Sequence, residues 1–130
     1  MNPVQSENLA RHLAELADSK KAEEIVAMDM RGLVAYTDFL IVCTARNERQ
    51  ARAIVDEVRV RVKEDSGLLP GGVDGGGEAG WTIIDYLDVV LHVFTPDARD
   101  RYQLEDLWHE APRLELDLEA PEAPSAAAGA

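Results

Sequence analysis

Apolar residues recur at helical spacing in two parts of the chain, and both parts are predicted to be helices. In the first twenty residues, the repeat forms a single apolar stripe. The second repeat runs from Glu48 to Asp65, with apolar residues on one face and charged residues on the other. Its apolar positions are Ala51, Ile54, Val55, Val58 and Val62. Asn47 suits the N-cap of this helix, and Gly67 suits its carboxyl end.

Shorter apolar runs predict four strands. Glu24–Met30 is typical of a short strand. Asp38–Thr44 is apolar on both faces, which is the pattern of an interior strand. Trp81–Tyr86 and Asp88–Thr95 are separated only by Leu87, so they are predicted to pair as a hairpin whose second strand is also interior.

The rest of the chain predicts a glycine-rich loop, a last helix and a tail. Gly71–Gly80 holds six glycines in ten residues, which favours a mobile loop. Pro96 opens a helical stretch that ends at Trp108. This order of elements predicts one α/β domain over residues 1–111, with a mixed sheet flanked by helices. Residues 112–130 are acidic and then rich in Pro and Ala, so we expect a largely disordered tail.

Charge and composition narrow the classes of partner and compartment. The 130 residues include 25 acidic and 13 basic side chains, which gives a net charge of −12. Such a chain is poorly suited to direct nucleic-acid binding and better suited to a basic partner. The apolar run Phe39–Cys43 is far too short to span a membrane, and the start of the chain does not resemble a secretion leader. With a single cysteine, Cys43, we expect a cytoplasmic protein without an internal disulfide.

Candidate catalytic groups are few. The glycine run leads into a strand and lacks Gly-Lys-Ser/Thr, which disfavours a phosphate loop. Asp85 and Asp88 are a candidate pair for a metal or for acid–base work, but aspartates are ordinary at a hairpin tip. His92 is predicted to be a hydrogen-bonded core residue, and Cys43 a small buried side chain. No histidine has the spacing of a zinc ligand. We therefore expect no metal, no cofactor and no enzymatic activity.

The hairpin carries the most informative aromatic residues. Trp81 follows the glycine run and Tyr86 lies at the tip, where they serve either to recognise a partner or to cap the sheet. Recognition is slightly favoured, because Trp and Tyr are enriched at interface hot spots. The turn at Tyr86-Leu87 is unusual, since two-residue hairpin loops normally need positive φ and select Asn or Gly. We expect either a wider loop or backbone strain there.

Several segments together resemble the ribosomal silencing factor family, also called RsfS or Iojap. These segments are Thr37–Thr44, Arg49–Ala51, Ala53–Val58, Gly80–Phe94 and Arg101–Trp108, within about residues 4–110. The resemblance implies an α/β fold related to nucleotidyltransferases but without their catalytic glycine-serine and carboxylate signature. It also implies a translational repressor that binds the fourteenth protein of the large ribosomal subunit. By occupying that face, it would block joining of the subunits when nutrients are short. The resemblance is also compatible with a homodimer.

The resemblance assigns the partner-binding residues to the hairpin and to the start of the second predicted helix. These residues are Trp81, Asp85, Tyr86, Asp88, Arg49 and Gln50. Family members commonly carry Gly or a polar residue where this chain has Leu87. The glycine run and the acidic tail are not part of the family pattern, so no role is assigned to them.

Two other functions stay open at this point. One is a divergent, metal-dependent enzyme similar to nucleotidyltransferases, which would use Asp85 and Asp88. The other is an adaptor that binds a different basic protein through the same face.

Overall fold

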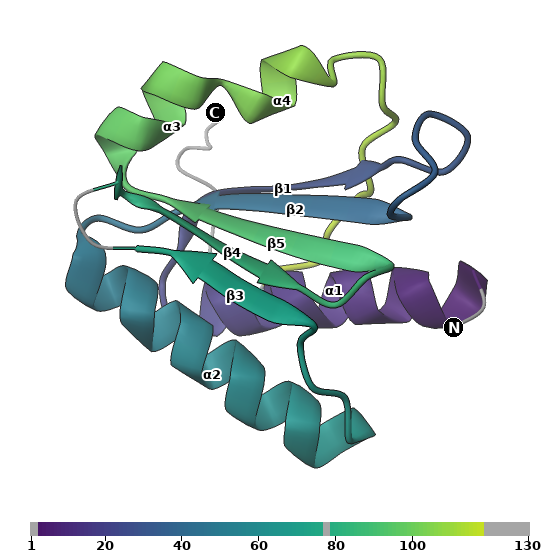
Figure 1. Ribbon diagram of the computed structural model, residues 1–130, viewed down its shortest axis with the longest axis horizontal. Coiled ribbons are helices and arrows are strands. Elements are labelled where there is room, and N and C mark those ends of the chain that lie inside the picture. The colour runs from purple at the N-terminus through teal and green to yellow at the C-terminus, as the bar shows by residue number, and fades with distance from the viewer. Residues whose placement is uncertain (1–2, 77–78, 119–130) are drawn as a thin grey trace.

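The computed structural model describes residues 3–76 and 79–118. Within these residues, five strands form one mixed sheet in the order β1-β2-β5-β4-β3 (Figure 1). The strands are β1 (Glu23–Asp29), β2 (Phe39–Thr44), β3 (Gly72–Gly75), β4 (Trp81–Asp85) and β5 (Val89–Phe94). The helices are α1 (Pro3–Ser19), α2 (Glu48–Ser66), α3 (Pro96–Tyr102) and α4 (Leu104–Leu107). Strands β2 and β5 run parallel and the other neighbouring pairs are antiparallel, which confirms the predicted α/β fold with a mixed sheet.

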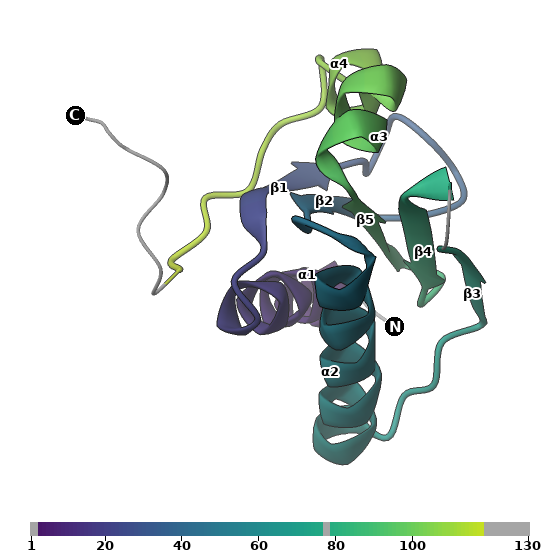
Figure 2. The same ribbon diagram turned by 90° about the vertical axis from the view of Figure 1, so that its left-hand side faces the viewer.

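The sheet has a core on each of its faces. Helices α1 and α2 cover one face, and α3 and α4 lie across the other (Figure 2). The first core includes Phe39, Ile41, Cys43, Leu91 and Val93. The second core includes Leu40, Val42, Val90 and Phe94. All residues of β2 and β5 are buried, which confirms both as interior strands, because side chains on both faces of such a strand must be apolar.

Helix α2 follows its sequence pattern closely. The five residues of the predicted apolar stripe are its buried residues. The side chain of Asn47 accepts a hydrogen bond from the backbone N–H of Gln50 at 2.8 Å. Gly67 has a φ of 72° and donates its N–H to the carbonyl of Lys63, which closes the helix. The sequence therefore contains both the packing face and the boundaries of α2.

The glycine-rich segment contains a strand, so the prediction of a mobile loop is wrong for Gly72–Gly75. These residues form β3, which pairs with β4 at the edge of the sheet. Gly75 has a φ of 91°, and a Cβ atom there would collide with the backbone carbonyl of Trp81. Glycine lets the edge strand approach β4 closely at this point. Gly77 and Glu78 of the predicted loop lie outside the described residues.

Residues 112–114 pair with β1 and the chain packs against the core as far as Leu118, which departs from the disorder expected of the tail. The N–H of Asp29 donates to the carbonyl of Pro112 at 2.7 Å, and the N–H of Leu114 donates to that of Ala27 at 2.8 Å. Three alternate leucines of this segment pack against the core beneath α1, namely Leu114, Leu116 and Leu118. The segment thus adds backbone pairing and apolar contacts to the sheet. Residues 119–130 lie outside the described part of the chain, and the domain boundary stays a prediction.

The predicted last helix is divided by Gln103, whose φ of 47° separates α3 from α4. The bend returns Glu105 to α3, where Nε of Arg99 donates to its Oε2 at 2.8 Å. Nη1 of Arg99 also donates to Oγ1 of Thr44 in β2 at 2.7 Å. Arg99 therefore joins both short helices to the sheet from a buried position.

Candidate functional site

The predicted contact residues on the hairpin are divided between the two faces of the sheet. Trp81 begins β4 and packs into the core under α3 and α4, whereas Tyr86 packs into the core under α1 and α2. Trp81 also pairs with Phe94 at one end of the hairpin, while Tyr86 and Asp88 belong to the tip at the other end. Asp85 shares the face of Trp81, because successive side chains of a strand alternate.

An aromatic surface surrounds Trp81. Its ring centroid lies 4.4 Å from that of Tyr102 and 5.0 Å from that of Phe94. Trp81 is half-buried and Tyr102 is 43% exposed, so both rings are accessible in part. Ile83 and Asp85 continue the same face of β4 and are also half-buried. We call Trp81, Ile83, Asp85 and Tyr102 the aromatic face.

Tyr102 is, with Ile83, one of two residues of this face that the sequence-based site omitted. It lies 21 positions after Trp81 in the sequence, and no spacing rule links the two. They meet because α3 begins directly after β5 and runs back across the sheet (Figure 1). Two signals in the sequence pointed to it: most of the aromatic residues follow the glycine run, and Tyr102 lies in the segment Arg101–Trp108 that resembles the family.

His92 holds the ring of Trp81 in place. Nε1 of Trp81 donates to Nδ1 of His92 at 3.1 Å, and His92 is only 8% exposed. Burial lowers the pKa of His92 to about 4, against a weaker opposing effect of the Asp85 charge. The imidazole is therefore neutral at physiological pH and its Nδ1 is free to accept the hydrogen bond. This confirms the prediction of a hydrogen-bonded core histidine.

Tyr86 is a core residue, with only 5% of its surface exposed. Burial raises the pKa of its phenol, against the weaker effect of Arg59, and the hydroxyl has no hydrogen-bond partner among the described residues. A change of Tyr86 to alanine would remove a large side chain from the core, with a cost of several kcal/mol in stability. Such a variant cannot separate a contact with a partner from folding.

The hairpin tip is narrow and strained rather than wide. Leu87 has a φ of 73°, which is unfavourable for a residue with a Cβ atom. Its N–H donates to Oδ1 of Asp85 at 2.7 Å, and the N–H of Asp88 donates to the carbonyl of Tyr86 at 3.0 Å. Of the two expectations for this turn, backbone strain is the one the structure shows.

Replacement of Leu87 by glycine is expected to raise the free energy of unfolding by about 0.5 to 1 kcal/mol. Glycine removes a left-handed strain of about 1–2 kcal/mol, and its greater freedom in the unfolded chain offsets part of that gain. Leu69 is a matched control, because it is equally exposed but has no positive φ. In urea titrations, Leu69→Gly should lower the midpoint of unfolding. A decrease of the same size for Leu87→Gly would contradict the conclusion that the backbone at Leu87 is strained.

Arg49 and Gln50 lie in the first turn of α2 but differ in what they offer to a partner. Arg49 is exposed, and it is available for contact. Oε1 of Gln50 accepts from the N–H of Arg46 at 2.6 Å, and its Nε2 lies 3.0 Å from the carbonyl oxygens of both Lys20 and Lys21. Gln50 thus fastens the start of α2 to the end of α1, and its polar atoms are occupied within the chain.

The described residues form a surface for recognition more readily than a reaction centre. Asp85 belongs to the aromatic face and Asp88 to the opposite side of the tip, and in residues 3–76 and 79–118 no three metal-ligating side chains come together. Burial raises the pKa of the Cys43 thiol to about 12, which disfavours the nucleophilic thiolate. None of the described helices has both the length and the apolar character needed to cross a membrane.

Comparisons with known proteins agree on one family. The family model described as "Ribosomal silencing factor during starvation" matches residues 3–130. The Ribosomal silencing factor RsfS of Halalkalibacterium halodurans is 37% identical over 114 residues, which cover 88% of this chain and 97% of that protein. The chloroplastic protein Iojap of Arabidopsis thaliana is 34% identical over 110 residues, or 85% of this chain and 45% of that protein. A crystal structure of a Chromobacterium violaceum protein matches with a TM-score of 0.74 and 29% identity, covering 95% of this chain and 97% of that one.

Proposed function

This chain belongs to the ribosomal silencing factor (RsfS/Iojap) family of non-enzymatic ribosome-binding factors, and we propose that it blocks joining of the ribosomal subunits by binding the large one. The family description links it to starvation and to the regulation of translation. In this proposal, the protein binds in the cytoplasm to the fourteenth protein of the large subunit. Its bulk then occupies the face that the small subunit needs.

The aromatic face is the feature of the structure that most directly supports this proposal. Trp81 and Tyr102 present two adjoining, partly exposed rings, and aromatic rings of this kind are enriched among interface hot spots. Asp85 places a carboxylate on the same face of β4, at the end next to the hairpin tip, which suits Lys or Arg on a basic ribosomal protein. The hydrogen bond from Trp81 to His92 fixes the indole before binding, so little side-chain entropy is lost on docking.

Charge supports the same partner class. The net charge of −12 attracts a basic protein at long range and repels the phosphates of ribosomal RNA. Repression by this mechanism requires no catalytic reaction. An ordinary interface of about 800 Å² per partner is enough to hold the domain where it blocks the small subunit. A homodimer is compatible with this mechanism and is not required by it.

Trp81→Ala and Tyr102→Ala are each expected to weaken binding to purified large subunits by about 2 kcal/mol, or roughly thirtyfold. Each change removes a ring from the aromatic face, and Tyr102 is exposed enough for its loss to leave the fold intact. Tyr36→Ala is the matched control, because Tyr36 is 64% exposed and lies outside the aromatic contacts. Co-sedimentation gives the affinities, and circular dichroism checks folding.

The same purified subunits and protein variants test whether binding blocks subunit joining. Wild-type protein should sediment with the large subunit alone and should stop it from rejoining the small subunit. Unchanged affinity for both folded ring variants would remove the aromatic face from the proposal. Binding to neither subunit would overturn the proposed function itself.

A further inference from the structure

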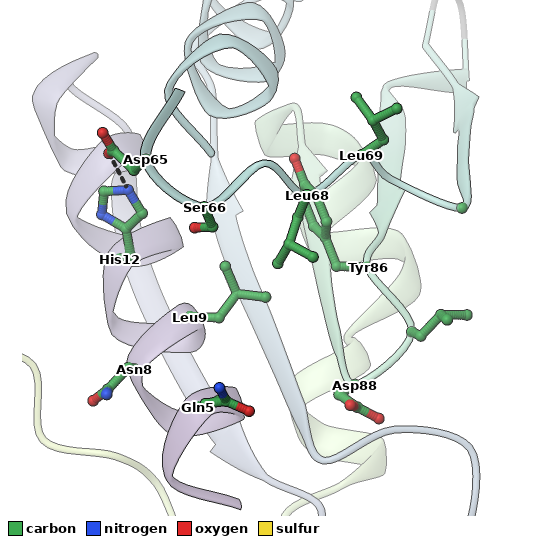
Figure 3. Close-up of a pocket in the computed structure, with 12 residues that line it drawn as sticks. Gln5, Asn8, Leu9, His12, Asp65, Ser66, Leu68, Leu69, Tyr86 and Asp88 are labelled. Carbon is green, nitrogen blue, oxygen red and sulfur yellow. Dashed lines mark hydrogen bonds and ion pairs between the residues drawn. The ribbon is translucent and has the colours of Figure 1, made fainter. Parts of the chain in front are cut away.

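A pocket of about 820 Å³ opens beside the hairpin tip (Figure 3). It lies on the side of the sheet that α1 and α2 cover, opposite the aromatic face. Its walls come from α1, from the carboxyl end of α2 and the loop that follows it, and from the tip itself. Leu9, Leu68 and Tyr86 give it an apolar lining, and Leu9 and Tyr86 are more than nine-tenths buried. Its volume is within the range of sites that take small organic groups.

Two exposed leucines lie at this pocket. Leu69 is 67% exposed and Leu87 is 68% exposed, and they come from different loops. Single exposed leucines are ordinary, but two that line one partly apolar pocket form a surface whose covering by a partner is favourable. Leu87 lines the pocket with a strained backbone, at a φ of 73°. Backbone strain of this kind clusters at ligand-binding and active sites.

The polar groups of the pocket favour a cation. Asp65 and Asp88 line it, and none of its described lining residues is Lys or Arg. Asp65 lies 3.0 Å from Nε2 of His12, an interaction that ties α1 to the end of α2 (Figure 3). Carboxylates beside an apolar lining suit an occupant with an apolar body and a basic group.

We propose that this pocket receives an apolar side chain that is flanked by Lys or Arg on the basic ribosomal protein, an inference that rests on the function proposed above. The hairpin connects the two surfaces: Asp85 belongs to the aromatic face, and Leu87, two residues later, belongs to the pocket. A partner seated on the aromatic face reaches the pocket by passing around the tip. The partner is thereby held on both sides of the hairpin.

Filling the pocket from α2 tests the inference. Ser66→Trp introduces a large side chain at an exposed lining position, and we expect it to weaken binding to the large subunit at least tenfold. Val60→Trp is the matched control, because Val60 is 51% exposed on the same helix and does not line the pocket. The control should bind within twofold of wild type, and circular dichroism should show both variants folded.

Trp81→Ala separates this inference from the proposed function. If Trp81→Ala weakens binding while folded Ser66→Trp binds like Val60→Trp, the pocket is not a contact and the proposed function stands. If wild-type protein binds no large subunit, the proposed function fails, and the partner assigned to the pocket fails with it.

Two small molecules test, in the absence of the ribosome, whether the pocket binds an apolar group and prefers a cation to an anion. Tryptamine and 3-indolepropionate share an indole and carry opposite charges. In NMR titrations of the full chain, tryptamine should shift the backbone amides of Leu9, Leu69 and Leu87, and the response should be lost in Ser66→Trp. An equal or larger response to the anion would overturn the preference for a cation, and no response to either probe would overturn the pocket as a binding site.

Discussion

Replacement of Arg99 by methionine is expected to lower the free energy of unfolding by about 3 to 5 kcal/mol. The side chain of Arg99 is only 8% exposed and donates to both Glu105 and Thr44. Without the guanidinium group, the Glu105 carboxylate stays mostly buried and loses its counter-charge. Its second oxygen already has no hydrogen-bond partner in the described structure, so nothing there compensates for the loss.

Urea unfolding followed by circular dichroism measures this effect, with Arg52→Met as the matched control. Arg52 is 66% exposed and forms an ordinary i,i+4 pair with Glu48, so its loss should cost less than about 0.5 kcal/mol. The double variant Arg99→Met/Glu105→Leu should recover most of the stability, because it removes the unpaired charge as well. An Arg99→Met variant as stable as Arg52→Met would show that the pair does not hold α3 and α4 to the sheet.

Acidification from pH 7 to pH 4 is expected to cost about 3 kcal/mol of stability through His92 alone. Burial lowers the pKa of His92 in the folded protein to about 4, whereas an unfolded histidine titrates near its ordinary value of 6.5. Between these values the unfolded chain binds the proton more readily. Stability is therefore full above pH 6.5 and falls as the pH drops toward 4. A proton on Nδ1 also ends its hydrogen bond from Trp81.

A His92→Phe variant isolates this effect from the titration of the carboxylates. Phenylalanine keeps an aromatic ring beside Trp81 and Phe94 but cannot take up a proton. The difference in unfolding free energy between wild type and variant should shift by about 3 kcal/mol, in favour of the variant, between pH 7 and pH 4. Trp81 fluorescence should change over the same range in wild type only. Parallel stability profiles for the two proteins would contradict the role of His92.

The buried elements of the fold were predictable because burial requires apolar residues at every position that faces the core, and this pattern is visible in the sequence. Strands β2 and β5 are apolar throughout and proved to be interior, and α2 carries both its apolar stripe and its caps in the sequence. Strand β3 was missed because its pairing depends on β4, and a run of glycines gives no sign of a distant partner. The pairing of 112–114 with β1 and the packing of the leucines that follow were missed for the same reason, since acidic side chains between the leucines made the segment resemble a solvated tail.

The sequence allowed individual residues of the candidate site to be predicted. It did not allow us to predict which of them lie together on one surface. Alternation along β4 already separates Trp81 from Tyr86, because one occupies an odd and the other an even position. That signal was available in the sequence, and the two residues indeed pack on opposite faces. The contributions of Tyr102 to the aromatic face and of α1 to the pocket were not available. Both depend on contacts between segments that lie far apart in the chain.

The attachment of residues 112–118 to the domain, by pairing of 112–114 with β1 and by packing of the leucines, has a consequence for protein engineering. A truncated variant that ends at residue 111 would expose the backbone donors and acceptors along the outer side of β1, where Asp29 and Ala27 now have partners. It would also uncover the apolar surface that Leu114, Leu116 and Leu118 protect. Bare strand edges next to apolar surface are templates for aggregation. An expression fragment of this domain should therefore extend at least through Leu118, and a fusion partner at that end should follow a linker that leaves the segment free to pair.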